Sequence, residues 1–330
     1  MPSRRSLTRR SVLAGGAAGL AATLDGTARA QAFPTGPVKI IVGVGPGSSA
    51  DIICRLVADH LSRVWGQQAI VLNQPGAGGA ISIRAAGSSP PDGATLFMSL
   101  ASNYVLLPQM QETLPFNVAR DFVPIGFVGD QPLVITAAPA LGVNSLAEFI
   151  TLAKKRPGEL NVAGGLAGSV LHLTAEWLRT AAGVDFTILH YPAVPQAIVD
   201  LVGGRIQLAV DSITGVAGAI SGGQLKALAV AAAQRLPNFP QWPTASETLP
   251  GFVASGWLAL MAPPKTPDAI AHKVSADLRT VLDRGEVKQR MLELGTYPIA
   301  MSPAELADFI ANQQRTWRPI IETVGMKARK

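Results

Sequence analysis

The stretch "VKIIVGVGPGSSADIICRL", residues 38–56, decides the fold class of this chain. An apolar run is followed by three glycines within five residues and then by an amphipathic segment. A buried strand, a glycine-rich turn and a helix, in this order, form the opening unit of parallel α/β sheets. This unit places a helix N-terminus beside the carboxyl end of a strand, where such sheets bind ligands. The sequence therefore predicts an α/β protein with a small-molecule site at this loop.

The same order of elements recurs at residues 162–178, "VAGGLAGSVLHLTAEWL". Short apolar strands alternate with amphipathic helices over most of the chain, which is typical of a doubly wound parallel sheet. We therefore expect two α/β domains. From Pro267 onward the chain should be mainly helical and cover the first domain, with Ser302 and Glu305 forming a capping box. The expected strands are 38–42, 69–72, 95–99, 133–137, 160–163, 187–190, 208–210 and 227–231, and the expected helices are 51–65, 81–86, 146–155, 170–182 and 196–203.

The net charge is concentrated at the N-terminus. The 330 residues carry a formal charge of +6, and five arginines against Asp25 place +4 of it in the first thirty residues. The remainder has 23 basic against 21 acidic residues, an ordinary surface that does not indicate a nucleic-acid partner.

The same N-terminal segment predicts an export signal over residues 1–30. A basic start precedes a short apolar run and Ala28-Arg29-Ala30, so we expect cleavage after Ala30 and a periplasmic mature chain. The stretch "TRRSVLA", residues 8–14, is similar to a twin-arginine signal, and the general secretory route is the alternative.

Cysteine and histidine usage argues against a metal centre. Cys54 is the only cysteine, which excludes an intrachain disulfide, and it should lie on the buried side of its helix. The four histidines form no ligand-like pair. No metal site is expected.

A dinucleotide site at the first loop is one alternative. Gly43, Gly45 and Gly47 are spaced G-x-G-x-G, whereas the dinucleotide motif is G-x-G-x-x-G. An acidic residue should also follow the second strand to hold the ribose, but Asn73 and Gln74 stand there. We expect no cofactor.

An anion site needs less. Backbone N–H groups at glycine-rich helix starts bind carboxylate or phosphate without a basic side chain. The loops "GPGSSAD", "GAGG", "SLASN" and "AGS" supply such backbone together with hydroxyls, and none contains Lys or Arg. Asp51 is expected to cap its helix, and contact with a ligand through water is compatible with that role.

A hydrolase would need an activated nucleophile. Ser169 and His172 are three residues apart on one expected helix, so their side chains could meet. The chain has no G-x-S-x-G elbow, and no acid is evident to orient His172. We interpret His172 as structural and expect no enzymatic activity.

Taken in order, several stretches make the chain resemble extracytoplasmic solute receptors of the tripartite tricarboxylate transporter type, the Bug family. They include "FPTGPVKIIVGVGPGSSADIICRL", "RDFVPIGFVG", "GSVLHLTAEWL", "YPAVPQAIVDLVGGRIQLAVD" and "WLALMAPPKTP". The resemblance implies a type II-like periplasmic-binding-protein fold, whose two domains close on the ligand like a flytrap. It assigns residues 31–129 and 257–330 to domain 1 and residues 130–256 to domain 2, with crossings near 129–133 and 256–260.

The resemblance also implies the site. The ligand carboxylate would be held by the loops Gly45–Asp51 and Gly165–His172, with Tyr191 and Asp211 facing the cleft. Together with the hydroxyl argument, the predicted ligand-binding residues are Gly45, Pro46, Gly47, Ser48, Ser49, Asp51, Ser102, Gly165, Gly168, Ser169, His172, Tyr191 and Asp211.

Three departures from the family pattern bear on the ligand. Ser48 and Leu166 stand where glycine is common, and Pro192-Ala193 replace a basic residue and glycine. A less basic wall predicts a ligand other than citrate, such as a smaller or aromatic carboxylate or an amide. The expected function is capture of a small organic acid by a monomer for delivery to a membrane permease. The alternatives are a receptor that reports to a sensor kinase and an exported dinucleotide-dependent enzyme.

Overall fold

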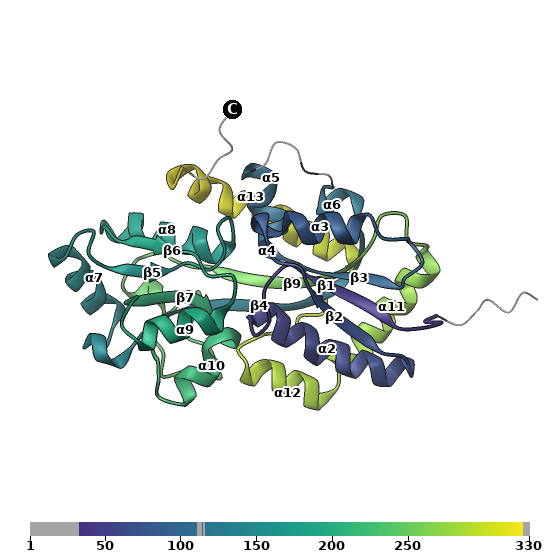
Figure 1. The fold of residues 1–330 in the computed structure, drawn as a ribbon, viewed down its shortest axis with the longest axis horizontal. Coiled ribbons are helices and arrows are strands. Elements are labelled where there is room, and N and C mark those ends of the chain that lie inside the picture. The colour runs from purple at the N-terminus through teal and green to yellow at the C-terminus, as the bar shows by residue number, and fades with distance from the viewer. Residues whose placement is uncertain (1–32, 111–113, 115, 326–330) are drawn as a thin grey trace, which may run out of the picture.

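The computed structural model describes residues 33–110, 114 and 116–325. The predicted export signal lies outside the described residues. The described chain forms two α/β domains side by side, joined by the crossing strands β4 (Val123–Ala137) and β9 (Ser255–Ala262) (Figure 1). One continuous strand order, β2-β1-β3-β9-β4-β7-β5-β6 with β8 also on β4, runs through both domains.

The first domain is built around β1 (Val38–Val42), which pairs in parallel with β2 (Ala69–Asn73) and β3 (Thr95–Leu100). Successive side chains of a strand point to opposite faces of its sheet. Ile40 accordingly packs in the cluster of α2 (Ser49–Trp65), and Ile41 packs in the cluster of α3 (Ala80–Gly87). This is the predicted doubly wound arrangement. The shorter elements of this domain are η1 (Ala77–Gly79), α4 (Ala101–Val105), α5 (Leu107–Met110) and α6 (Val118–Asp121).

The second domain repeats the pattern around β5 (Asn161–Ala163), which is parallel to both β6 (Thr187–Leu189) and β7 (Leu208–Ser212). The C-terminal half of β4 joins this sheet antiparallel to β7 and β8 (Lys226–Val230). Its helices and turns are η2 (Pro139–Leu141), α7 (Leu146–Lys155), α8 (Val170–Ala182), α9 (Val194–Val202), α10 (Ile213–Ser221) and η3 (Ala245–Glu247).

The crossing strands are the main departure from the predicted elements. A strand was expected over 133–137, but β4 begins ten residues earlier, at Val123, and β9 was not among the expected strands. The first half of β4 contains Pro124, Gly126 and Gly129, and its register with β9 shifts twice there. Proline and glycine interrupt the strand signal of the Val, Ile and Phe residues between them, so the long-range pairing with β9 is what makes the segment a continuous strand. The other predicted elements agree with the structure within two residues at either end.

The last three helices pack mainly on the first domain, as predicted. They are α11 (Asp268–Leu282), α12 (Gly285–Glu293) and α13 (Pro303–Thr323). The predicted capping box is confirmed: Ser302 N donates to Glu305 Oε2 at 2.7 Å, and Glu305 N donates to Ser302 Oγ at 3.3 Å.

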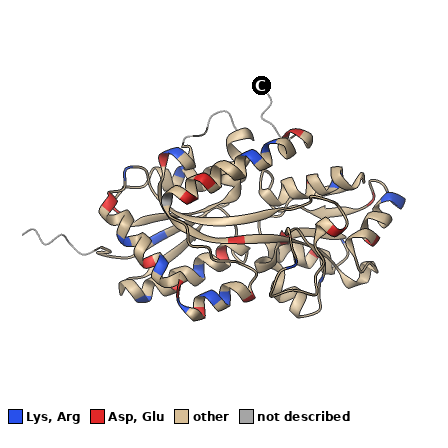
Figure 2. Ribbon diagram, turned by 180° about the vertical axis from the view of Figure 1, so that it is seen from behind, with Lys and Arg blue, Asp and Glu red and all other residues tan. Residues whose placement is uncertain are grey.

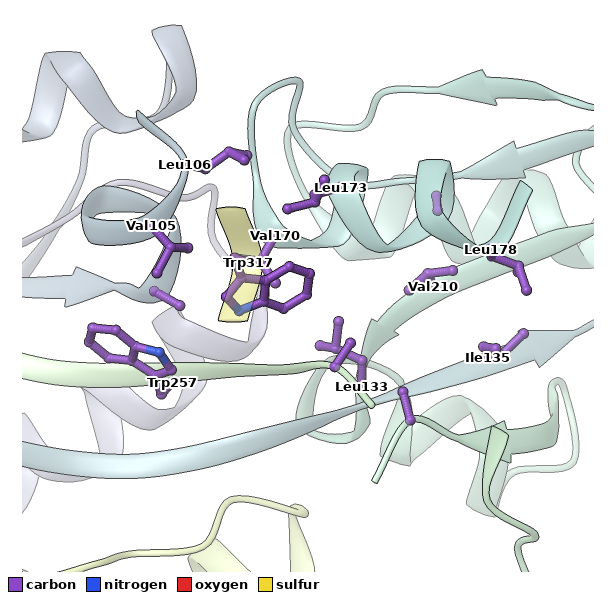
Figure 3. Close-up of a cluster of buried hydrophobic side chains, with 14 of the residues drawn as sticks. Val105, Leu106, Leu133, Ile135, Val170, Leu173, Leu178, Val210, Trp257 and Trp317 are labelled. Carbon is purple, nitrogen blue, oxygen red and sulfur yellow. The ribbon is translucent and has the colours of Figure 1, made fainter. Parts of the chain in front are cut away.

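Helix α13 also reaches the second domain. Gln314 Nε2 donates to Tyr104 O at 2.9 Å in the first domain. The ring of Trp317 lies 6.1 Å from that of Trp177 on α8. Buried side chains of both domains, among them Trp257, Leu133 and Trp317, belong to one apolar cluster (Figure 3). The two domains are therefore in contact.

Charged residues lie chiefly on the helices and loops around the sheet (Figure 2). Cys54 is fully buried, as predicted. Among the described residues, no helix has both the length and the apolar character needed to cross a membrane.

Candidate ligand-binding site

A pocket lies between the two domains, with about 790 Å³ of empty space including the part open to solvent. The crossing strands contribute Gln131, Leu133 and Trp257 to its lining. The first domain adds Ser48, Ser49 and Ser102, and the second adds Gly165, Ser169, Tyr191 and Asp211.

The first loop is held in shape by Asp51. Gly47 has a φ of +78°, and its N–H donates to Asp51 Oδ2 at 2.9 Å. Asn73 Nδ2 donates both to Asp51 Oδ1 at 2.8 Å and to Val44 O at 3.0 Å. Burial by itself would raise the pKa of Asp51, but hydrogen bonds from Arg55, Asn73 and Gly47 lower it below its usual value. Asp51 is therefore an ionised brace of the loop.

Asp51 does not occupy the cap position itself. Ser48 is the N-cap of α2, and Asp51 is the third helical residue, reaching back to the loop. Asn73, which stands where a dinucleotide site needs a carboxylate, is committed to the same brace. Neither side chain lines the pocket.

The second loop is braced by His172. Gly168 N donates to His172 Nδ1 at 3.2 Å, and Ser169 Oγ accepts from His172 N at 3.2 Å as the N-cap of α8. Burial and the neighbouring His190 lower the pKa of His172 to about 4, so its ring is neutral at pH 7. An acid does stand beside the ring, because His172 Nε2 lies 3.7 Å from Glu176 Oε1. Both ring nitrogens thus face groups other than the Ser169 hydroxyl, which agrees with a structural histidine.

Five helices begin at the pocket. Their cap or first-turn residues line it, and α2, α9 and α10 begin without a side-chain hydrogen bond at the cap. Unsatisfied N–H groups and the helix dipole make the starts of α2, α9 and α10 attractive to an anion. The lining residues of the five helix starts are Ser48 and Ser49 of α2, Ala101 and Ser102 of α4, Ser169 and Val170 of α8, Ala193 and Val194 of α9, and Ser212 of α10.

The described lining contains no Lys, Arg or His, and its only carboxyl group is Asp211. Asp211 is 6% exposed, and burial raises its pKa to about 7 in spite of hydrogen bonds from Ser212. Tyr191 lines the pocket, but its hydroxyl donates to Asp200 Oδ2 at 2.9 Å. Burial and the Asp200 carboxylate raise the pKa of Tyr191 to about 12.

The structure brings seven of the thirteen predicted residues to the pocket wall. The other six build the loops behind it or stand at its rim, where Gly45 N donates across the domains to Pro192 O at 3.3 Å. Those on the wall are Ser48, Ser49, Ser102, Gly165, Ser169, Tyr191 and Asp211; those off it are Gly45, Pro46, Gly47, Asp51, Gly168 and His172.

Several parts of the wall were not predicted from the sequence. Gln131 and Trp257 come from crossing strands that only long-range pairing defines. The start of α9 was detectable, because Pro195 at its second position is a helix-start signal. Leu166 and Pro192-Ala193, the departures from the family pattern, do face the pocket. Among the described residues no group of three His, Cys, Asp or Glu side chains could hold a metal ion.

Comparison with known proteins agrees with this architecture. The family model described as "Tripartite tricarboxylate transporter family receptor" matches residues 53–326. Protein BugT of Bordetella pertussis is 33% identical over 312 residues, which is 94% of each chain. A solved R. palustris protein with adipate is 27% identical with a TM-score of 0.87, covering 90% of this chain and all of that one. MatC from Rhodopseudomonas palustris with bound malate is 28% identical with a TM-score of 0.82, covering 88% and 100%. The chain therefore belongs to the tripartite tricarboxylate transporter receptor family, in which it joins the Bug proteins.

Proposed function

We propose that this protein is an extracytoplasmic receptor that captures a small organic acid between its two domains. The observation that carries the proposal is the interdomain pocket, where five helix N-termini and several hydroxyls meet and the described lining contains no Lys, Arg or His. The solved relatives contain adipate and malate, which are both small organic acids.

Binding would rest on many weak contacts with the backbone. One helix N-terminus contributes roughly 0.3–2 kcal/mol to holding an anion, depending on its burial. Several such ends, together with hydroxyl hydrogen bonds, would have to supply the roughly −8 kcal/mol of a micromolar complex. Closure then follows from contacts that the ligand makes only when both domains surround it.

Delivery to a membrane permease completes the proposal. The chain would be exported, lose residues 1–30 after Ala30, act as a monomer and present its ligand to a transporter of the tripartite type. Domain 1 would comprise residues 31–129 and 257–330, and domain 2 residues 130–256. The crossing of β4 and β9 supports these boundaries.

A thermal-shift screen of the chain from Gln31 tests the proposal. The panel holds mono-, di- and tricarboxylates, amino acids, aromatic acids, NAD and flavin. A ligand that binds only the folded state raises the melting temperature by mass action. We expect a shift with small acids and a smaller one with citrate. A shift with NAD or flavin alone would overturn the proposal.

A further inference from the structure

The pocket wall has two chemically different parts. Most of it supplies hydrogen-bond donors, and Asp211 supplies a carboxyl group. The donors are helix N-termini and hydroxyls, and no cation of the described lining accompanies Asp211. A receptor that relied on charge attraction alone would not place its single carboxyl group in an anion pocket. The group therefore calls for a ligand-based explanation, which rests on the proposed function.

The hydrogen bonds of Asp211 leave one oxygen free. Ser212 N donates to Oδ1 at 2.7 Å and Ser212 Oγ reaches the same atom at 3.4 Å. Oδ2 accepts from none of the described residues, and no described cation forms an ion pair with this carboxyl group. Burying a carboxylate that is 6% exposed without a partner for one of its oxygens costs free energy. A ligand that donates a hydrogen bond to Oδ2 would remove this cost.

A second buried polar group points to the same conclusion. Trp257 is 1% exposed and lines the pocket, and its indole N–H has no acceptor among the described residues. Figure 3 shows this nitrogen on the side of the ring turned toward Leu133, another residue of the wall. Native proteins rarely leave such a donor unpaired. The lining residues thus include both a donor and an acceptor for which the described residues supply no partner.

We propose that Asp211 is a specificity-determining residue that accepts a hydrogen bond from the ligand. The ligand is then an acid that carries a hydroxyl, amide or ammonium donor besides its carboxylate. The helix N-termini hold the carboxylate, and Asp211 Oδ2 holds the donor. At pH 8, above the raised pKa of Asp211, an acid whose second group is an ionised carboxylate brings like charge to Asp211 and binds more weakly.

A matched series of acids tests this proposal on the unaltered mature chain. Straight-chain acids of three to six carbons carry a methyl, hydroxyl, ammonium or second carboxylate group at the far end, and affinities are measured by calorimetry at pH 8. We expect the affinity of the hydroxyl or ammonium acid to be at least about tenfold higher than that of the dicarboxylate of equal length. The hydroxyl and ammonium arms identify which donor the site prefers.

The variant Asp211→Asn tests the residue itself, because an amide keeps the shape and removes the charge. We expect it to lose about tenfold in affinity for the preferred acid and to gain affinity for the dicarboxylate. Asp130→Asn is the matched control, since Asp130 also has a pKa raised by burial, to about 6, but does not line the pocket. It should keep the wild-type selectivity, and circular dichroism checks that both variants fold.

The outcomes separate the two proposals. If dicarboxylates bind the unaltered chain as tightly as the hydroxyl and ammonium acids, the role of Asp211 is overturned and the receptor function stands. If Asp211→Asn folds and keeps the wild-type order of affinities, the role of Asp211 is likewise overturned. If no acid of the series or of the wider screen binds, the proposed function fails, and the inference drawn from it fails as well.

Discussion

At the scale of single residues, two serines at corresponding helix starts have different tasks. Ser169 Oγ accepts from His172 N and so caps α8, whereas Ser48, the cap residue of α2, makes no such bond. Both residues line the pocket. The Ser48 hydroxyl thus has no cap bond to break when a ligand binds, whereas the Ser169 hydroxyl keeps its O–H for a ligand while it accepts the cap bond.

The two alanine variants should separate stability from binding. Ser169→Ala should cost about 0.5–2 kcal/mol of unfolding free energy through the lost cap. Ser48→Ala should leave the melting temperature nearly unchanged and weaken ligand binding several-fold. Thermal unfolding and calorimetric titration measure the two quantities. Equal melting temperatures for the two variants would contradict the assignment of the cap to Ser169.

Asp211 should also give the fold a measurable pH dependence. An exposed aspartate has a pKa of 3.8, whereas burial raises the pKa of Asp211 to about 7 in the folded protein. Between these values the folded state binds more protons than the unfolded state, so the contribution of Asp211 to stability falls as pH rises from about 4 to 7 and is constant above. Replacing it with Asn removes this penalty.

The difference in melting temperature between Asp211→Asn and the unaltered protein isolates this effect. It should be largest above pH 7 and shrink toward pH 4. The lowered pKa of His172, about 4, acts in the opposite direction below pH 6.5, where the unfolded state takes up the proton first. That contribution is common to both proteins and cancels. A difference that does not change with pH would contradict the raised pKa of Asp211.

At the scale of elements, the loop between β1 and α2 joins the folding of one domain to its contact with the other. Gly47 has a φ of +78°, and a Cβ atom added there would lie 3.0 Å from Pro195 Cγ of α9. Gly142 has the same φ of +78° but no atom within 4 Å of such a Cβ. The two positions share the backbone strain, and of the two only Gly47 has a neighbour in the other domain.

Alanine at each of these glycines should therefore have a different consequence. Both Gly47→Ala and Gly142→Ala should cost about 1–2 kcal/mol of stability through the left-handed backbone. Only Gly47→Ala should weaken acid binding, because its methyl group presses on the opposite wall. Binding is measured by calorimetry on both variants. Unchanged binding by Gly47→Ala would show that this loop does not form the closed site.

At the scale of the whole molecule, a backbone hydrogen bond joins the two domains at the rim of the pocket. Gly45 N donates to Pro192 O at 3.3 Å, and a Cβ on Gly45 would lie 2.8 Å from that same oxygen. Gly36, in the same domain, has no atom within 4 Å of an added Cβ. A methyl group on Gly45 would clash with Pro192 O only while the two domains are in contact at the rim, so it would not disturb the arrangement in which they have moved apart.

Gly45→Ala should thus shift the population toward the open arrangement, whereas Gly36→Ala should behave as the unaltered protein. Small-angle X-ray scattering gives the radius of gyration with and without a saturating acid. We expect a larger radius for Gly45→Ala and a weaker apparent affinity, because the ligand must also supply the free energy of closure. A radius equal to that of the Gly36→Ala control would contradict the rim contact as a determinant of closure.

Much of the architecture could be predicted from the sequence, because much of it is local. The β1–α2 and β5–α8 units follow from hydrophobic periodicity and glycine placement within about twenty residues, and both were located within two residues. The same local signals identified Ser302 and Glu305 as a capping box. Family membership followed from the order of such stretches along the chain.

The family resemblance placed the crossings near 129–133 and 256–260, but local patterning did not reveal the full length of the two crossing strands. The first half of β4 contains Pro124, Gly126 and Gly129, and it becomes a strand only through β9, more than a hundred residues later. Gln131 and Trp257 reach the pocket through that pairing. Local sequence carries no record of a partner so distant.

The sequence by itself therefore determined the α/β class, the two glycine-rich loops and the family. Each depends on short-range sequence patterns, because the local conformation of a strand, turn or helix is set largely by residues close together in the chain. Only the tertiary structure decided that five helix N-termini meet in one pocket and that Asp211 stands among them without a cation in the described lining. The direction of a side chain and the depth of its burial depend on the packing of segments far apart in the chain. The chemistry of the pocket is set by those long-range contacts.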